Sequence, residues 1–150
     1  SPFVAITLFC PLGGWVTDRL AAKRGVNIGR AYVGMAGMLL ASLSIVVGAF
    51  SDIPWLAITL LWVGAGWLYF TVGAYWASTV DLSKSHAGAL SGLMNTGANL
   101  GGSLSPTLTP WLADSFGWPG ALAAAAGIAL VGGLMWIRIK PGDGLAEPSQ

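Results

Sequence analysis

Residues 87–113 read AGALSGLMNTGANLGGSLSPTLTPWLA, and this stretch decides the fold class because it contains no charged residue. A helix rises about 1.5 Å per residue, so about 20 residues cross the roughly 30 Å hydrocarbon core of a bilayer. Polar and apolar residues do not alternate with period two here, as they would in a membrane barrel. Because an unpaired backbone is very costly in lipid, the stretch predicts a membrane-spanning helix.

The same pattern recurs on both sides of this stretch. Short charged segments separate further uncharged runs, of which the first is shorter than a complete span. These runs cover residues 1–17, 31–51, 53–80 and 115–137. The sequence therefore predicts an all-α, polytopic transmembrane helical bundle of about four and a half spans over residues 1–140, followed by a disordered cytoplasmic tail over 141–150.

Prolines refine the expected helices. Pro54 and Pro119 lie at or near the starts of the third and fifth spans, where a missing N–H costs little. Pro106 and Pro110 fall late in the fourth span, which we expect them to bend or loosen.

Composition excludes several classes of protein. Hydrophobic residues make up 55% of the chain and charged residues 9%, whereas a soluble domain carries roughly 25% charged residues. This excludes an ordinary soluble enzyme and a basic nucleic-acid binder. The single cysteine, Cys10, excludes an intrachain disulfide and a multi-cysteine zinc site. With no P-loop, zinc spacing or hydrolytic triad either, we expect no catalytic residues, no bound metal, no cofactor and no nucleic-acid partner.

The charges also predict an orientation. If the spans alternate in direction, all seven basic residues fall at one side of the bilayer, and Asp52 and Asp114 fall at the other. The seven are Arg19, Lys23, Arg24, Arg30, Lys84, Arg138 and Lys140. By the positive-inside rule the basic side is cytoplasmic. We therefore expect a multi-pass protein of the cell's inner (plasma) membrane with a cytoplasmic C-terminus.

The first basic loop carries the strongest local motif, Gly13-Gly14-Trp15-Val16-Thr17-Asp18-Arg19. A small residue such as Gly14 lets another helix approach closely, and Asp18 can meet the positive end of a neighbouring helix. Arg19 holds the loop at the lipid surface. The spacing resembles the G-x3-D-[RK]-x-G-x-[RK]-[RK] motif of the major facilitator superfamily, in the weaker form found between helices eight and nine, because Leu20-Ala21-Ala22 replaces a glycine. The alternative is a basic loop that only sets topology.

Residues 75–106 extend this resemblance. They are similar to the helix ten to helix eleven region of the anion:cation symporter family, which includes galactonate, glucarate, hexuronate, sialic acid and vesicular glutamate transporters. The matching residues are Asp81, Ala87-Gly88, Gly92, Asn95, Gly101-Gly102 and Pro106, although Ser83 or Lys84 stands where that family usually has proline. The resemblance implies that the chain is the C-terminal part of a twelve-helix transporter, from the end of helix eight to helix twelve, with helices one to seven outside it.

Candidate binding residues lie on one face of the fourth span. Ser91, Asn95 and Asn99 recur every fourth residue, and amides in a span need protein, water or ligand. We therefore expect this face to line a cavity, and the face with Gly97 and Gly101 to pack on a neighbouring helix. The family resemblance implies substrate contact for Asn95. The alternative for both amides is a hydrogen bond to another helix, and for Asn99 we favour that alternative.

A second candidate face lies on the third span. Trp67, Thr71 and Tyr75 share this face at four-residue spacing. An aromatic ring beside a hydroxyl suits a sugar-acid ligand, although packing is the more common role of aromatic residues at mid-membrane.

Taken with the resemblance, these features predict secondary active transport of a small organic anion, a sugar acid or other carboxylate, by alternating access. The resemblance also implies coupling to a proton or sodium ion. Because no span interior carries Asp, Glu, His, Lys or Arg, we expect the anion-neutralising cation and the ion relay in the missing N-terminal half. The resemblance implies that the partner of Asp18 lies there as well. The alternatives are a facilitator-superfamily exporter of apolar compounds and a non-transporting structural subunit of a membrane complex.

Overall fold

The computed structural model describes residues 2–144, and these form helices, turns and short connections with no strand among them. Five helices follow one another: α1 (Pro2–Arg24), α2 (Val26–Ala49), α3 (Pro54–Phe70), α4 (Val72–Leu82) and α5 (Ala87–Met135). Two 3-10 turns close the described chain, η1 (Trp136–Arg138) and η2 (Pro141–Asp143). The predicted all-α class is confirmed.

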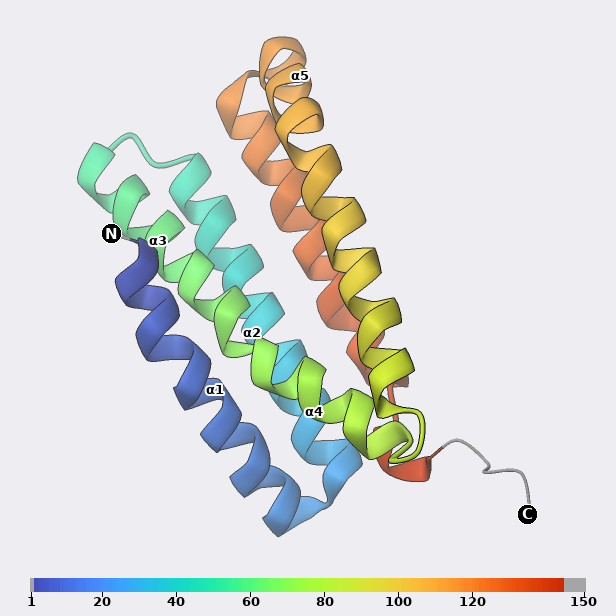
Figure 1. Ribbon diagram of the computed structural model, residues 1–150. Coiled ribbons are helices and arrows are strands. Elements are labelled where there is room, and N and C mark those ends of the chain that lie inside the picture. The colour runs from blue at the N-terminus through green and yellow to red at the C-terminus, as the bar shows by residue number, and fades with distance from the viewer. Residues whose placement is uncertain (1, 145–150) are drawn as a thin grey trace.

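α5 is a helical hairpin rather than one rod. The backbone leaves helical geometry at Gly117, with φ 74° and ψ 167°, a conformation that favours glycine because it has no Cβ. Figure 1 shows the chain reversing there, so that a first arm (residues 87–116) and a second arm (118–135) lie side by side. Pro106 and Pro110 lie inside the helical first arm, and the break falls at Gly117 instead.

The spans match the expected lengths. Three helical segments are long and apolar enough to cross a bilayer: Val26–Ala49, Pro54–Leu82 and Ala87–Asp143. The second combines α3 and α4, which meet at Thr71, and the third contains the α5 hairpin and therefore two passes. Together with α1, these segments give the partial bundle predicted from the charge pattern.

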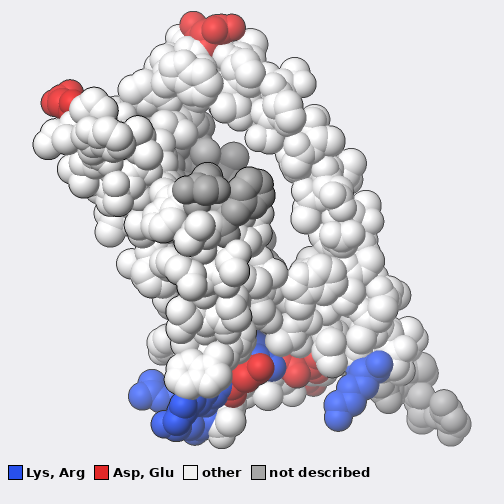
Figure 2. Space-filling model, turned by 60° about the vertical axis from the view of Figure 1, so that its left-hand side comes forward, with Lys and Arg blue, Asp and Glu red and all other residues white. Residues whose placement is uncertain are grey.

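Charged residues lie at the two ends of the bundle. Figure 2 shows lysine and arginine at one end, with acidic groups among them, and further acidic groups at the opposite end. The first end carries the α1–α2 connection, the α4–α5 connection and η2, and the second carries the α2–α3 connection and the α5 reversal. We call these the basic end and the acidic end.

α2 is the central element, because it packs against α1, α3 and both the hairpin and the turns that follow it. The buried core cluster, Val33, Ala74 and Trp136, joins α2, α4 and η1. Trp136 is 1% exposed, and its ring covers Gly34, where any side chain would collide with it. The Ser42 hydroxyl donates to the Ala126 carbonyl at 2.8 Å and so links α2 to the second arm of α5.

The C-terminal segment begins with ordered structure. Residues 141–143, predicted from the sequence to start a disordered tail, form η2, and Pro141 is buried. Residues 145–150 lie outside the described part of the chain.

Candidate functional site

A cavity of about 420 Å³ lies between α4 and the first arm of α5. Its lining residues are Val72, Tyr75, Trp76, Met94, Asn95 and Ala98. The walls are thus mainly aromatic and aliphatic, with one amide and one phenol among them. An apolar pocket with a few polar groups is the usual form of a small-molecule site.

Asn95 is the polar residue of this cavity that is free to bind a ligand. Its side chain is exposed and forms no hydrogen bond with the described residues, while its backbone carbonyl accepts a bond of 2.9 Å from the Asn99 side chain. A side-chain amide can donate two hydrogen bonds and accept two. Because these remain unused, Asn95 presents a donor and an acceptor to the cavity.

Tyr75 is held in place on the opposite wall. Its hydroxyl donates to the Met38 sulfur at 3.0 Å, and its ring meets the Trp136 ring edge-on with centroids 5.0 Å apart. The second contact ties the ring to Trp136 of the buried core cluster, and Met38 packs against the same cluster. Tyr75 therefore offers a fixed aromatic surface, across the α4–α5 seam from Asn95.

The structure places Ser91 and Asn99 outside the lining of this cavity. The Ser91 hydroxyl lies 2.7 Å from that of Thr79, so it bridges the first arm of α5 to α4. The Asn99 amide bonds within its own helix. The polar stripe expected along the fourth span is therefore divided: one amide faces the cavity, and its neighbours have local partners.

Trp67 and Thr71 are also placed away from the cavity. The Trp67 ring packs edge-on against Phe9 and Phe70, at centroid distances of 5.2 and 5.4 Å. Thr71 is 2% exposed, and its hydroxyl donates to the Leu68 carbonyl at 2.7 Å. The predicted face is split because α3 packs on α1 and α2, whereas α4 also contacts α5. Of its three residues, only Tyr75 reaches the cavity.

A second cluster lies at the basic end. Arg30, near the start of α2, donates from Nη1 to Asp18 Oδ1 at 2.5 Å and from Nε to Asp81 Oδ2 at 2.8 Å. The Arg30 side chain is 10% exposed, that of Asp81 24% and that of Asp18 70%. The guanidinium group therefore ties together α1, α2 and α4 with bonds of the stronger, charge-assisted kind.

This cluster corrects the expectation that Asp18 lacks its partner within the chain. Arg30 supplies that partner, and Thr17 supports it by donating to the Gly29 carbonyl at 3.2 Å. Sequence reasoning treated Arg30 only as a topogenic base and Asp81 only as a mark of resemblance. The sequence did contain a signal for this cluster: Asp18, Arg30 and Asp81 all lie in segments that the charge pattern places at the basic end.

The other motif residues have different surroundings. In the part of the chain that the structure describes, nothing lies within 4 Å of a Cβ built on Gly14, whereas one on Gly13 would collide with the Phe70 backbone carbonyl. Another helix nevertheless comes close at Gly14 as well, because a Cβ built on Gly73 of α4 would lie 2.6 Å from the Gly14 Cα. Both glycines of the motif therefore allow close helix contacts. The Arg19 guanidinium lies 4.8 Å from the centroid of the Trp15 ring, a cation–π distance.

The glycine face of the fourth span has no neighbour in the described part of the chain. Nothing lies within 4 Å of a Cβ built on Gly97 or Gly101. The expected packing is thus not made within residues 2–144.

The amino-acid sequence is similar to that of a known protein family and of several of its members. The family model described as Major Facilitator Superfamily matches residues 1–150. The chain is 30% identical over 135 residues to the hexuronate transporter of Bacillus subtilis, covering 86% of this chain and 32% of that protein.

Two further similar proteins are also named as transporters. A D-galactonate transporter of Escherichia coli is 28% identical over 145 residues, covering 92% of this chain and 32% of the relative. A probable chloroplastic anion transporter 4 of Oryza sativa is 25% identical over 148 residues, covering 97% and 25%. The chain therefore spans about a quarter to a third of the length of the curated relatives it matches.

Proposed function

The chain belongs to the Major Facilitator Superfamily, whose family model matches it from end to end, and from this we propose that it is the C-terminal part of a secondary transporter for a small organic anion. The relatives named as hexuronate and D-galactonate transporters support a sugar acid or similar carboxylate as substrate. We further propose that the chain corresponds to the end of helix eight through helix twelve, and that an N-terminal half is its partner.

The observation that carries the proposal is the unpartnered Asn95 amide in the cavity between α4 and α5. The amide can donate to a carboxylate or hydroxyl oxygen and accept from a hydroxyl proton. The Tyr75 and Trp76 rings can cover the apolar face of a sugar-acid carbon chain. We propose these residues as the contribution of this chain to the substrate site.

Among the described residues, 2–144, no charged residue lines this cavity. An organic anion buried there needs a cation, because an unpaired buried charge is very costly. We propose that the cation and the relay for a coupling proton or sodium ion belong to the N-terminal half. Substrate would then be enclosed between the two halves and released by alternating access.

We assign the Arg30 cluster to this conformational cycle. It joins α1, α2 and α4 at the end of the bundle opposite the α5 reversal. Because α4 also supplies Tyr75, the cluster fixes the position of one cavity wall relative to α1 and α2. In this proposal Gly14, Asp18 and Arg19 form the segment that meets the other half.

One observation favours a second candidate function. The cavity walls are mainly apolar, and this suits an exporter of apolar compounds as well as a symporter. The two candidates differ in the dependence on Asn95, because an apolar substrate gains nothing from a free amide.

The proposal is tested by Asn95→Ala in the full-length protein. Losing a hydrogen bond to a ligand costs about 0.5–1.5 kcal/mol, and more when the ligand atom is charged, so the apparent affinity for hexuronate or galactonate should fall roughly several-fold. Binding and thermal stability are measured on the same purified variant. Asn99→Ala is the matched control, because the Asn99 amide bonds within its own helix, and it should leave affinity unchanged.

A loss of stability with unchanged affinity in Asn95→Ala would reject Asn95 as a substrate ligand. Transport of apolar compounds by the wild-type protein, unaffected by Asn95→Ala, would establish the exporter instead.

A further inference from the structure

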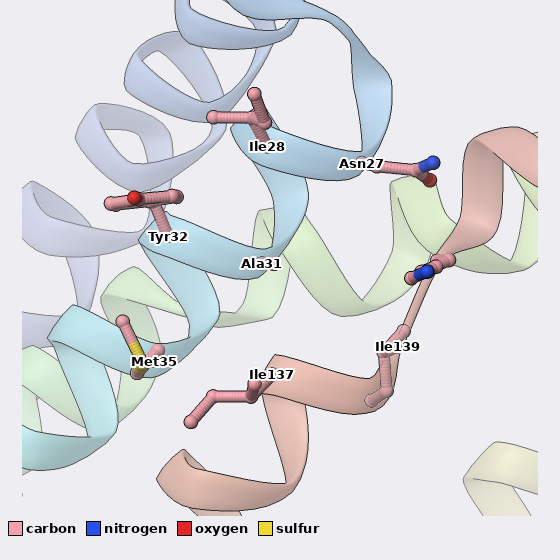
Figure 3. Close-up of a pocket in the computed structure, with 8 residues that line it drawn as sticks. Asn27, Ile28, Ala31, Tyr32, Met35, Ile137 and Ile139 are labelled. Atoms are coloured by element: carbon pink, nitrogen blue, oxygen red, sulfur yellow. The ribbon is translucent and has the colours of Figure 1, made fainter.

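A groove of about 270 Å³ lies on a different side of the bundle, between the first turns of α2 and the segment around η1. Ile28, Tyr32 and Met35 form one wall, and Ile137 and Ile139 form the other. Figure 3 shows these residues on the two elements, with Asn27 at the start of α2 directed toward the C-terminal segment. Tyr32 and Ile137 are 54% and 64% exposed, so the groove opens outward rather than into the core.

The polar end of the groove is built from Lys140. This residue follows directly on the Ile139 wall, is exposed, and forms no ion pair within residues 2–144. The groove is therefore amphipathic: Lys140, next to η2, supplies a cation at one end, and apolar side chains of α2 and of the segment around η1 line the rest.

Asn27 fixes the chain that carries Lys140. The Gly142 backbone N–H donates to Asn27 Oδ1 at 2.6 Å, and Asn27 Nδ2 donates to Asp143 Oδ1 at 2.8 Å. Pro141, between them and Lys140, is buried. Lys140 thus lies directly before a clamped turn instead of in a free tail, and its Cα is fixed beside the groove.

The charge around the groove is unbalanced. Asp18 and Asp81 bind Arg30, whereas Asp143 bonds to the uncharged Asn27 amide and keeps its negative charge. Seven basic residues against these three carboxylates leave this end positive within residues 2–144. The other six basic residues at this end form no ion pair in the described part of the chain. An excess of positive charge beside an apolar groove at the edge of a membrane span attracts amphipathic anions, and anionic phospholipid is the amphipathic anion that a bilayer supplies.

We propose that this groove holds one anionic phospholipid, with its phosphate near the Lys140 amine and an acyl chain against Ile28, Met35 and Ile137. Charge complementarity selects the headgroup, and the apolar walls select a lipid over a soluble anion. The site is separate from the cavity that contains Asn95, and it requires only that the chain spans a bilayer.

The test uses photo-crosslinkable lipids that carry a diazirine in the acyl chain. The full-length protein is reconstituted in phosphatidylcholine nanodiscs that contain a small, equal mole fraction of diazirine-labelled phosphatidylglycerol or phosphatidylcholine. Cross-linked peptides are then identified by mass spectrometry. A basic residue near the surface contributes about 1 kcal/mol toward an anionic lipid, so phosphatidylglycerol should label residues 28–35 and 137–139 about five-fold more than phosphatidylcholine.

Variants separate the site from general surface charge. Lys140→Gln should remove the preference for phosphatidylglycerol, whereas Lys84→Gln, which removes the same charge from the α4–α5 connection of the same end, should retain it. Asn27→Ala changes no charge but releases the clamp, and it should reduce the preference. Labelling by phosphatidylcholine reports whether each variant remains folded.

Equal labelling of the groove by both lipids in the wild-type protein would mean that only unspecific boundary lipid is present, and the proposal would fail. It would fail equally if Lys140→Gln kept the preference, or if Lys84→Gln lost it to the same extent. If Asn27→Ala left the preference for phosphatidylglycerol unchanged, the hydrogen bonds of Asn27 to residues 142 and 143 would have no role in lipid binding, and that part of the proposal would be rejected.

Discussion

Arg30 links three helices at the basic end. It lies on α2, and its two ion pairs reach Asp18 on α1 and Asp81 on α4. The two carboxylates differ in exposure, at 24% for Asp81 and 70% for Asp18. A charge-assisted bond to a shielded group contributes about 1.5–3 kcal/mol, whereas exposed ion pairs contribute about 0.2–1 kcal/mol. Asp81→Asn should therefore lower the free energy of unfolding in detergent more than Asp18→Asn does.

The double variant of Asp18 and Asp81 gives the control for this prediction. Because both carboxylates bind one guanidinium group, their effects should not add, and a double-mutant cycle should show coupling. Equal losses in the two single variants, with strict additivity, would mean that the cluster does not act as a unit.

At the scale of elements, close helix contacts depend on particular glycines. A Cβ on Gly13 would meet the Phe70 carbonyl, which is backbone and cannot rotate away. A Cβ on Gly127 would meet no atom of residues 2–144 within 4 Å. Gly13→Ala should force α1 away from α3 and destabilise the protein by about 1–3 kcal/mol. Gly127→Ala makes the same substitution in the second arm of α5 and should be neutral or stabilising by up to about 1 kcal/mol.

The measurement is denaturant unfolding of both variants in one detergent. A Gly13→Ala protein as stable as the wild type would show that α1 and α3 are not in close contact at this point.

The sequence predicted the membrane-spanning helices better than it predicted which helices pack against one another. Uncharged runs gave the spans because crossing a bilayer needs a certain apolar length. The same periodicity placed Trp67, Thr71 and Tyr75 on one face, but only Tyr75 lines the cavity, since which helix packs beside each turn is a tertiary property. Similarly, the bond between Arg30 and Asp81 joins residues 51 positions apart, which no local pattern encodes. Asn95, which helical spacing and the family resemblance singled out together, lies in the lining of the cavity, and its contact with substrate stays a prediction.

At the scale of the whole molecule, the remaining prediction is the orientation of the bundle in the membrane. All seven basic residues fall in segments of the basic end, and the positive-inside rule assigns that end to the cytoplasm. In a full-length protein with Cys10 replaced by alanine, a cysteine at Ser51 or Ser115 should react with an impermeant thiol reagent in intact cells, because the α2–α3 connection and the region of the α5 reversal would face outward. A cysteine at Ala22, exposed near the end of α1, should react only after the membrane is opened. Reaction of Ala22→Cys in intact cells, with Ser51→Cys and Ser115→Cys protected, would invert the bundle and with it the assignment of the Arg30 cluster to the cytoplasmic side.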